Sequence, residues 1–110
     1  FSNDRWDTYA EHTLLYILAM GSASHPVSKK CWKAWRRDFK TYKGYTYVHN
    51  SQESLFVYLF SQAWLDFRVK RDGKVNYCTN TTQAIKANRK FSQDNKKQFK
   101  TYESSIWGLS

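Results

Sequence analysis

The stretch LFVYLFSQAWLDFR, residues 55–68, is the longest strongly apolar segment of this 110-residue chain, and it contains one carboxylate near its end. Apolar residues occupy every side of the segment apart from Ser61, Gln62 and Asp66, which is the pattern of a buried helix rather than a surface helix. We therefore predict a buried helix over about residues 51–68. Helical spacing places Gln62 and Asp66 on the same face of it.

Asp66 is chemically unusual in such a helix. A carboxylate in the last turn opposes the helix dipole, and burial disfavours its charged form, so both effects predict a raised pKa. A carboxyl group with a raised pKa is suited to act as a general acid, which makes Asp66 a candidate catalytic residue. The structural alternative is that Asp66 pairs with Arg68 or Lys70, or caps a neighbouring loop.

Three further segments predict helices, over about residues 8–20, 26–39 and 82–99. Thr8 and Glu11 have the spacing of a capping box at the start of the first, and Gly21 follows it as a stop signal. The second has an apolar stripe opposite a face of Lys and Arg. Residues 41–50 alternate aromatic and polar side chains around Gly44, which predicts an extended loop or a short hairpin. The RDG sequence at 71–73 predicts a turn.

The four predicted helices differ in how their apolar residues are distributed. Two of them, at 8–20 and 51–68, are apolar on nearly every side, and they alternate with two amphipathic, charged helices. This alternation favours an all-α fold of inner helices covered by outer ones. A four-helix bundle would instead show one apolar stripe on each helix.

The formal net charge is +9, from 18 Lys and Arg against nine Asp and Glu, so nucleic acid is one class of partner to weigh. The cations fall mostly in helical segments among polar residues. Such a pattern more commonly indicates a solvent-exposed helix face than a nucleic-acid-binding surface, so we expect no nucleic acid.

No apolar stretch reaches the roughly 20 residues of a membrane span. Cys31 and Cys78 allow one disulfide without requiring it. The histidines lack metal-ligand spacing, and no nucleotide-binding motif is present, so we expect no metal or cofactor.

The N-terminal residues combine acids with aromatic rings. Trp6, Asp7, Tyr9 and Glu11 form an acidic, aromatic cluster in an otherwise basic chain. Aromatic faces stack on sugar rings and carboxylates accept hydrogen bonds from hydroxyl groups, so the mixture suits a carbohydrate ligand. The capping box explains Glu11 equally well, and Asp7 fits an acid favoured near a helix N-terminus.

Four blocks of sequence resemble the bacterial glycoamylase-like family: residues 9–35, 54–68, 79–94 and 102–110. AMGSASHP (19–26) and SQAWLDFR (61–68) are the most specific parts. The family includes endo-β-1,2-glucanases and domains attached to cyclic β-glucan enzymes. The resemblance implies an (α/α)6 toroid around a sugar-binding cleft, and a periplasmic or secreted location. About four helices make only part of a toroid, so we expect residues 1–110 to be a fragment that forms one segment of a larger catalytic domain. The remainder of that domain is then the partner against which this segment packs.

The resemblance also implies hydrolysis of a β-linked glucan, with β-1,2-glucan favoured, and an oligo- or polysaccharide as substrate. We assign Asp66 and Glu11 as catalytic candidates, and the following as substrate-binding candidates: Trp6, Asp7, Gln62, Arg68 and Trp107. Relatives often have histidine where this chain has Tyr58, Leu59 and Gln62, so this helix offers a substrate an amide in place of a titratable group. The alternatives are a non-catalytic carbohydrate-binding helical module and, less favoured, a basic nucleic-acid-binding domain.

Overall fold

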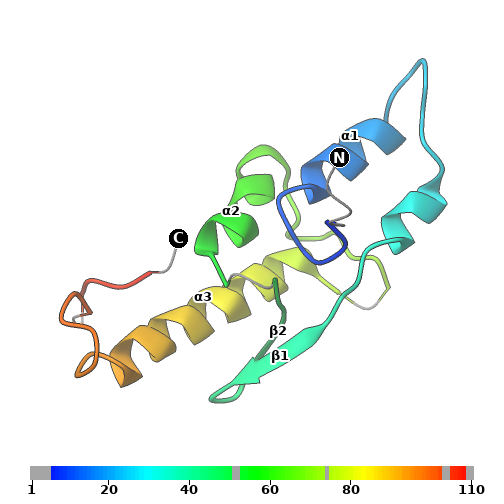
Figure 1. The fold of residues 1–110 in the computed structure, drawn as a ribbon. Coiled ribbons are helices and arrows are strands. Elements are labelled where there is room, and N and C mark those ends of the chain that lie inside the picture. Colours follow the sequence, from blue (N-terminus) through cyan, green and yellow to red (C-terminus); the bar gives the residue numbers. More distant parts are fainter. Residues whose placement is uncertain (1–5, 51–52, 74, 103–104, 109–110) are drawn as a thin grey trace.

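The computed structural model describes residues 6–50, 53–73, 75–102 and 105–108 (Figure 1). This part of the chain contains three α-helices, one short 3-10 helix and one antiparallel hairpin. In chain order they are α1 (Thr13–Met20), η1 (Lys29–Lys33), β1 (Phe39–Tyr42), β2 (Tyr45–Val48), α2 (Leu55–Trp64) and α3 (Tyr77–Asp94). The long helix α3 is the central element, with the hairpin along one side and α2 along another, while α1 packs against α2 and η1.

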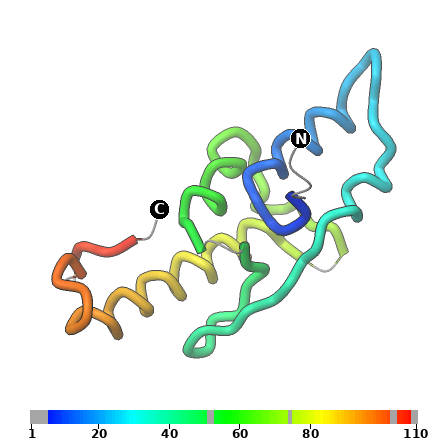
Figure 2. The backbone as a smooth tube through the Cα atoms, in the orientation of Figure 1, coloured from blue at the N-terminus to red at the C-terminus, as the bar shows by residue number. Residues whose placement is uncertain are grey.

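The side chain of Asn80 on α3 holds the hairpin by forming hydrogen bonds with the backbone of β2, as a neighbouring strand would. The amide of Asn80 accepts from the backbone N–H of Val48 at 2.6 Å and donates to the carbonyl oxygen of Val48 at 3.3 Å. Ala84 and Ala87 are buried further along the same helix face. Because their side chains are small, the strand and the helix can approach closely, which places the hairpin over α3 (Figure 2).

The core is unusually rich in tyrosine and tryptophan. Tyr9 stacks on Tyr58 of α2 at 5.3 Å and on Tyr77 of α3 at 6.0 Å between ring centroids, and Trp35 contacts it at 5.9 Å. Burial raises the pKa of Tyr9 to about 12 because a phenolate would lose its hydration there. These aromatic contacts join the segment before α1 to α2 and α3.

The all-α fold with a partial toroid is wrong. Among the residues that the structure describes, three α-helices and a two-stranded hairpin form a small mixed domain, and no toroid is evident. The sequence pattern favoured an all-α fold because the helical segments are long, whereas each strand of the hairpin has only four residues. Four residues offer few alternating positions, and alternation is the sequence signal of a strand. Of the two structures predicted around Gly44, an extended loop or a short hairpin, the antiparallel pairing of β1 with β2 shows the hairpin, with Gly44 at a φ of +88° in its turn.

The predicted helix over residues 26–39 is also wrong. Only η1 is helical there, and the chain then extends into β1. Arg37 provides the physical reason, because its guanidinium donates to the carbonyl oxygens of Trp32 and Trp35, at 2.8 and 3.0 Å, and pairs with Asp72 at 3.0 Å. Asp72 lies in the middle of the RDG sequence at 71–73. The turn predicted there is confirmed, because Gly73 has a positive φ. This tertiary ion pair outweighs the local helical pattern.

The other three predicted helices form, but their ends differ from the prediction. The prediction that the helices at 8–20 and 51–68 are buried is wrong, because α1 and α2 each expose large apolar side chains such as Leu18 and Trp64. The helix expected from residue 8 begins at Thr13, and the capping box is not formed because His12 is the N-cap residue. α2 ends at Trp64, so Asp66 lies outside it. α3 begins five residues before the expected start, at a point where the Asn76 side chain accepts from the backbone N–H of Thr79. Cys31 and Cys78 are free thiols.

Candidate functional site

Asp66 lies beyond the end of α2 and is paired with a cation. The guanidinium of Arg68 donates to both oxygens of the Asp66 carboxylate, at 3.0 and 2.7 Å, and the side chain of Asp66 is 49% exposed. Hydrogen bonds from the side chain and backbone of Arg68 hold the pKa of Asp66 well below its usual range. The expected raised pKa is therefore wrong, and the alternative pairing with Arg68 is confirmed.

Two other predicted residues lie where α2 meets its neighbours. The backbone carbonyl of Glu11 accepts from the hydroxyl of Ser61 at 3.3 Å. The amide of Gln62 donates to the carbonyl oxygen of Tyr77 at 3.2 Å and to the hydroxyl of Thr81 at 3.3 Å. In this structure Gln62 thus ties α2 to α3.

The aromatic and acidic candidates near the chain ends have separate surroundings. Asp7 forms an ion pair with Arg36 at 3.4 Å. Trp6 is exposed, and its ring lies 5.6 Å from that of His12. The ring of Trp107 lies 5.7 Å from the guanidinium of Arg89. None of the seven predicted site residues lines the pocket described next.

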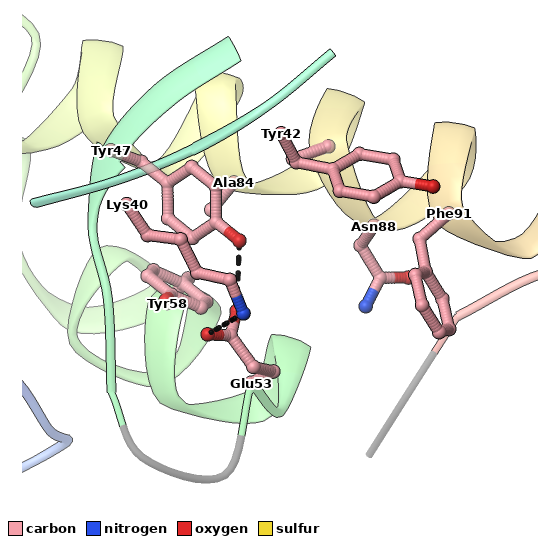
Figure 3. A pocket seen from close by; sticks show the side chains of 9 residues that line it. Lys40, Tyr42, Tyr47, Glu53, Tyr58, Ala84, Asn88 and Phe91 are labelled. Carbon is pink, nitrogen blue, oxygen red and sulfur yellow. Dashed lines mark hydrogen bonds and ion pairs between the residues drawn. The ribbon is translucent and has the colours of Figure 1, made fainter.

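A pocket of about 230 Å³ lies between the hairpin, the segment before α2, and α3 (Figure 3). Helix α2 also contributes to its walls, through Tyr58. Its lining residues are Lys40, Tyr42, Tyr47, Glu53, Tyr58, Ala84, Ala87, Asn88 and Phe91. Four of the nine are aromatic, and Glu53 is the carboxylate among them.

One side of the pocket is organised around Glu53. Its two carboxylate oxygens accept from the ammonium of Lys40 at 2.9 Å and from the hydroxyl of Tyr47 at 2.8 Å (Figure 3). The backbone N–H of Glu53 donates to the side chain of Asn50, which holds the residue at a φ of +58°. Burial and the neighbouring carboxylate raise the pKa of Tyr47, so its phenol stays protonated and remains a donor.

The opposite side of the pocket is formed by Tyr42 of the hairpin and by Asn88 and Phe91 of α3 (Figure 3). The rings of Tyr42 and Phe91 meet edge to face, with centroids 5.8 Å apart. The hydroxyl of Tyr42 donates to Asp94 at 3.1 Å, which fixes the ring against the helix. Asn88 is 8% exposed, and its side-chain oxygen has no hydrogen-bond partner among the described residues.

This combination favours one kind of ligand chemistry. Aromatic faces bind the apolar side of a ring, and carboxylate and amide groups bind hydroxyls, so the pocket suits a polyhydroxylated molecule. In the part of the chain that the structure describes, no cluster of three or more His, Cys, Asp or Glu residues is arranged to hold a metal ion. None of the helices described there has the length and apolar character needed to cross a membrane.

Sequence reasoning missed the pocket residues. The helix predicted over residues 51–68 includes Glu53 in its first turn, whereas in the structure Glu53 precedes α2. A signal was present in the hairpin, since Lys40 and Tyr42 are two residues apart and Lys40 pairs with Tyr47, which puts all three on one face. No spacing rule connects that face with Asn88, because only the docking of the hairpin on α3 brings them together.

Comparison with known families supplies the class of protein. The chain matches the family model Glycoamylase, described as "Putative glucoamylase", over residues 3–110. Because the match covers nearly the whole sequence, the chain belongs to this family, and the resemblance noted from its sequence blocks is confirmed. Membership indicates a function related to glycoside hydrolysis and a carbohydrate substrate. No curated protein and no solved structure matches the chain.

Proposed function

We propose that this chain is part of a glycoside hydrolase that acts on a β-linked glucan, with β-1,2-glucan favoured. The observation that supports the proposal most strongly is the family match over residues 3–110. The linkage rests on the resemblance to a family whose members include endo-β-1,2-glucanases, which residues 19–26 and 61–68 carry most specifically. We further propose that residues 1–110 form one segment of a larger catalytic domain.

Hydrolysis of a glycosidic bond needs one carboxylic acid to protonate the leaving oxygen and a second carboxylate to activate water or attack the sugar. Asp66 and Glu11 are our candidates. Because the pKa of Asp66 is lowered by Arg68, this carboxyl is ionised at neutral pH and fits the base or nucleophile rather than the acid. The acid then falls to Glu11 or to a carboxyl supplied by the remainder of the domain.

The test is an assay of the full natural protein that contains this chain, on linear β-1,2-glucan and on β-1,3- and β-1,4-glucans. Asp66→Asn and Glu11→Gln keep size and hydrogen-bonding shape while removing the charge. If Asp66 is the base or nucleophile, kcat falls by at least about a hundredfold in Asp66→Asn, a loss typical of such groups. Unchanged turnover in both variants would remove both residues from catalysis.

A non-catalytic carbohydrate-binding role is the second candidate. It is favoured by the half-exposed position of Asp66 in its ion pair with Arg68, away from the pocket, and by the lining of that pocket, in which Glu53 has no second carboxylate beside it. The two candidates differ in product formation. Glucan binding without release of reducing sugar, by the full protein as well as by this chain, would select the binding role.

A further inference from the structure

The polar side chains on the two sides of the pocket differ in whether they have hydrogen-bond partners. On one side Lys40 and Tyr47 already engage both oxygens of Glu53. On the other side the side-chain oxygen of Asn88 is buried without a partner among the described residues, although the side chain extends toward the pocket (Figure 3). A buried acceptor left without a hydrogen bond is destabilising, because it has lost its hydration and gained no partner in return. An outside group that completes the bond recovers part of that loss.

The surroundings of Asn88 restrict what that group is. Tyr42 and Phe91 present aromatic surfaces beside the amide, and Glu53 lies across the pocket from them (Figure 3). The opposite wall carries the Lys40–Glu53 ion pair, which has no net charge to attract an ionic ligand, and aromatic walls favour a ligand with an apolar face. A neutral sugar ring satisfies both conditions, because C–H groups cover its faces and hydroxyls its edge.

We propose that this pocket is a subsite for one neutral sugar unit, with the carboxamide of Asn88 bonded to a sugar hydroxyl and the ring packed against Tyr42 and Phe91. The terminal torsion of an asparagine side chain is soft, so rotation about it brings the oxygen of Asn88, which lies on the side of Phe91 in Figure 3, toward the ligand. The subsite is an addition to the proposed glucan activity and rests on it for the identity of the sugar. It assigns a binding role to residues on α3 and the hairpin.

The experiment measures binding to this chain, by titration calorimetry, of glucose disaccharides with β-1,2, β-1,3 and β-1,4 linkages and, for comparison, of α-linked glucose and mannose disaccharides. Asn88→Ala removes the amide, and we expect binding about three- to tenfold weaker, which is the effect of one hydrogen bond between neutral groups. Gln83→Ala is the matched control, because Gln83 is an amide on the same helix that does not line this pocket. Its affinity is expected to equal that of the unaltered chain.

Tyr42 allows the aromatic wall to be tested separately from its hydrogen bond. Tyr42→Phe deletes the hydroxyl that donates to Asp94 and keeps the ring, whereas Tyr42→Ala deletes the ring. We expect near-normal affinity for the first variant and about three- to tenfold weaker binding for the second. Thermal unfolding of each variant, followed by circular dichroism, establishes that a loss of binding is not a loss of fold.

The outcomes separate the subsite from the proposed substrate. Disaccharide binding that Asn88→Ala and Tyr42→Ala leave unchanged overturns the subsite while the glucan proposal stands. Binding of α-linked glucose or mannose disaccharides alone, with loss in both variants, supports the subsite and overturns the β-glucan assignment. Absence of binding to any of these sugars overturns the subsite, and the activity assay on the full protein then decides the glucan proposal.

Discussion

His12 shows how a single residue in this protein depends on its aromatic surroundings. It is 5% exposed at the start of α1, and its ring contacts those of Trp6, Tyr16 and Trp35 at centroid distances of 5.6, 5.2 and 5.8 Å. Burial lowers the pKa of His12 because the imidazolium ion would lose its hydration among these rings. The folded chain therefore holds this histidine neutral.

We predict that the free energy of unfolding decreases below about pH 6.5. In this range the imidazole of His12 is protonated in the unfolded chain but stays neutral in the folded chain, because burial lowers its pKa there. The loss reaches at most about 1.4 kcal/mol per pH unit and ends near the lowered pKa of the folded state. Urea unfolding of His12→Phe at pH 7.5 and pH 5 should show a smaller pH effect than the unaltered chain, because the ring remains and the titration does not. His25→Phe alters an exposed histidine and should keep the full effect; equal pH dependence in both variants contradicts the prediction.

Asp66 is the residue for which the ionisation state matters most to mechanism. Because Arg68 lowers its pKa, we predict that the carboxyl carbon of Asp66 shows no titration by NMR between about pH 4 and pH 8. Arg68→Gln should return the titration toward that of an ordinary aspartate. A midpoint above pH 5 in the unaltered chain would instead restore Asp66 as a general-acid candidate.

At the scale of elements, the beginning of α3 depends on its cap. The side-chain oxygen of Asn76 accepts from the backbone N–H of Thr79 at 2.9 Å, and the side-chain nitrogen donates to the carbonyl oxygen of Arg68 at 3.2 Å. Asn76 therefore both starts the helix and holds the preceding loop. The predicted start near residue 82 was too late because the polar residues of the first turns gave no apolar periodicity.

We predict that Asn76→Ala lowers the free energy of unfolding by about 1 kcal/mol, the usual effect of losing an N-cap. Asn76→Asp is the matched control, because a carboxylate oxygen still accepts from Thr79 while the bond to Arg68 is lost. Chemical denaturation of the three proteins measures the difference. Equal loss in both variants would assign the effect to the loop contact instead of the cap.

The elements also show which local patterns survive folding. The turn at Gly73, and the hairpin around Gly44 as one of two predicted alternatives, agree with the structure because each needs a positive φ that glycine adopts without strain. The helix predicted over 26–39 failed because Arg37 binds the carbonyl oxygens that a helix would use. Backbone conformation is thus predictable where one residue sets it locally, and not where a side chain such as Arg37, held by the sequence-distant Asp72, takes the carbonyl oxygens that a helix needs.

At the scale of the whole molecule, two helices in contact leave large apolar side chains in solvent. Leu15 and Leu18 of α1, and Phe56, Leu59 and Trp64 of α2, are between 45% and 67% exposed. Exposed apolar surface of this extent is costly in water and promotes association. We predict that this chain self-associates when prepared alone.

Light scattering after size-exclusion chromatography measures this association as mass against protein concentration. Leu18→Gln combined with Trp64→Gln should shift the population toward monomer by removing apolar area from both helices. Val69→Gln changes an 85% exposed residue outside these helices and should leave association unchanged. A monomer at every concentration of the unaltered chain contradicts the prediction.

The sequence was sufficient to identify the family, since the order of short blocks such as SQAWLDFR survives in the primary structure whatever the fold around it. It also predicted the hairpin, the turn and the existence of helices in three regions, because these follow from local backbone preferences and apolar spacing. The surroundings of Asp66 and the pocket formed by Glu53, Tyr42 and Asn88 depend instead on contacts between distant segments. A pKa or a binding surface is set by what lies around a side chain in space, and folding alone assembles those neighbours.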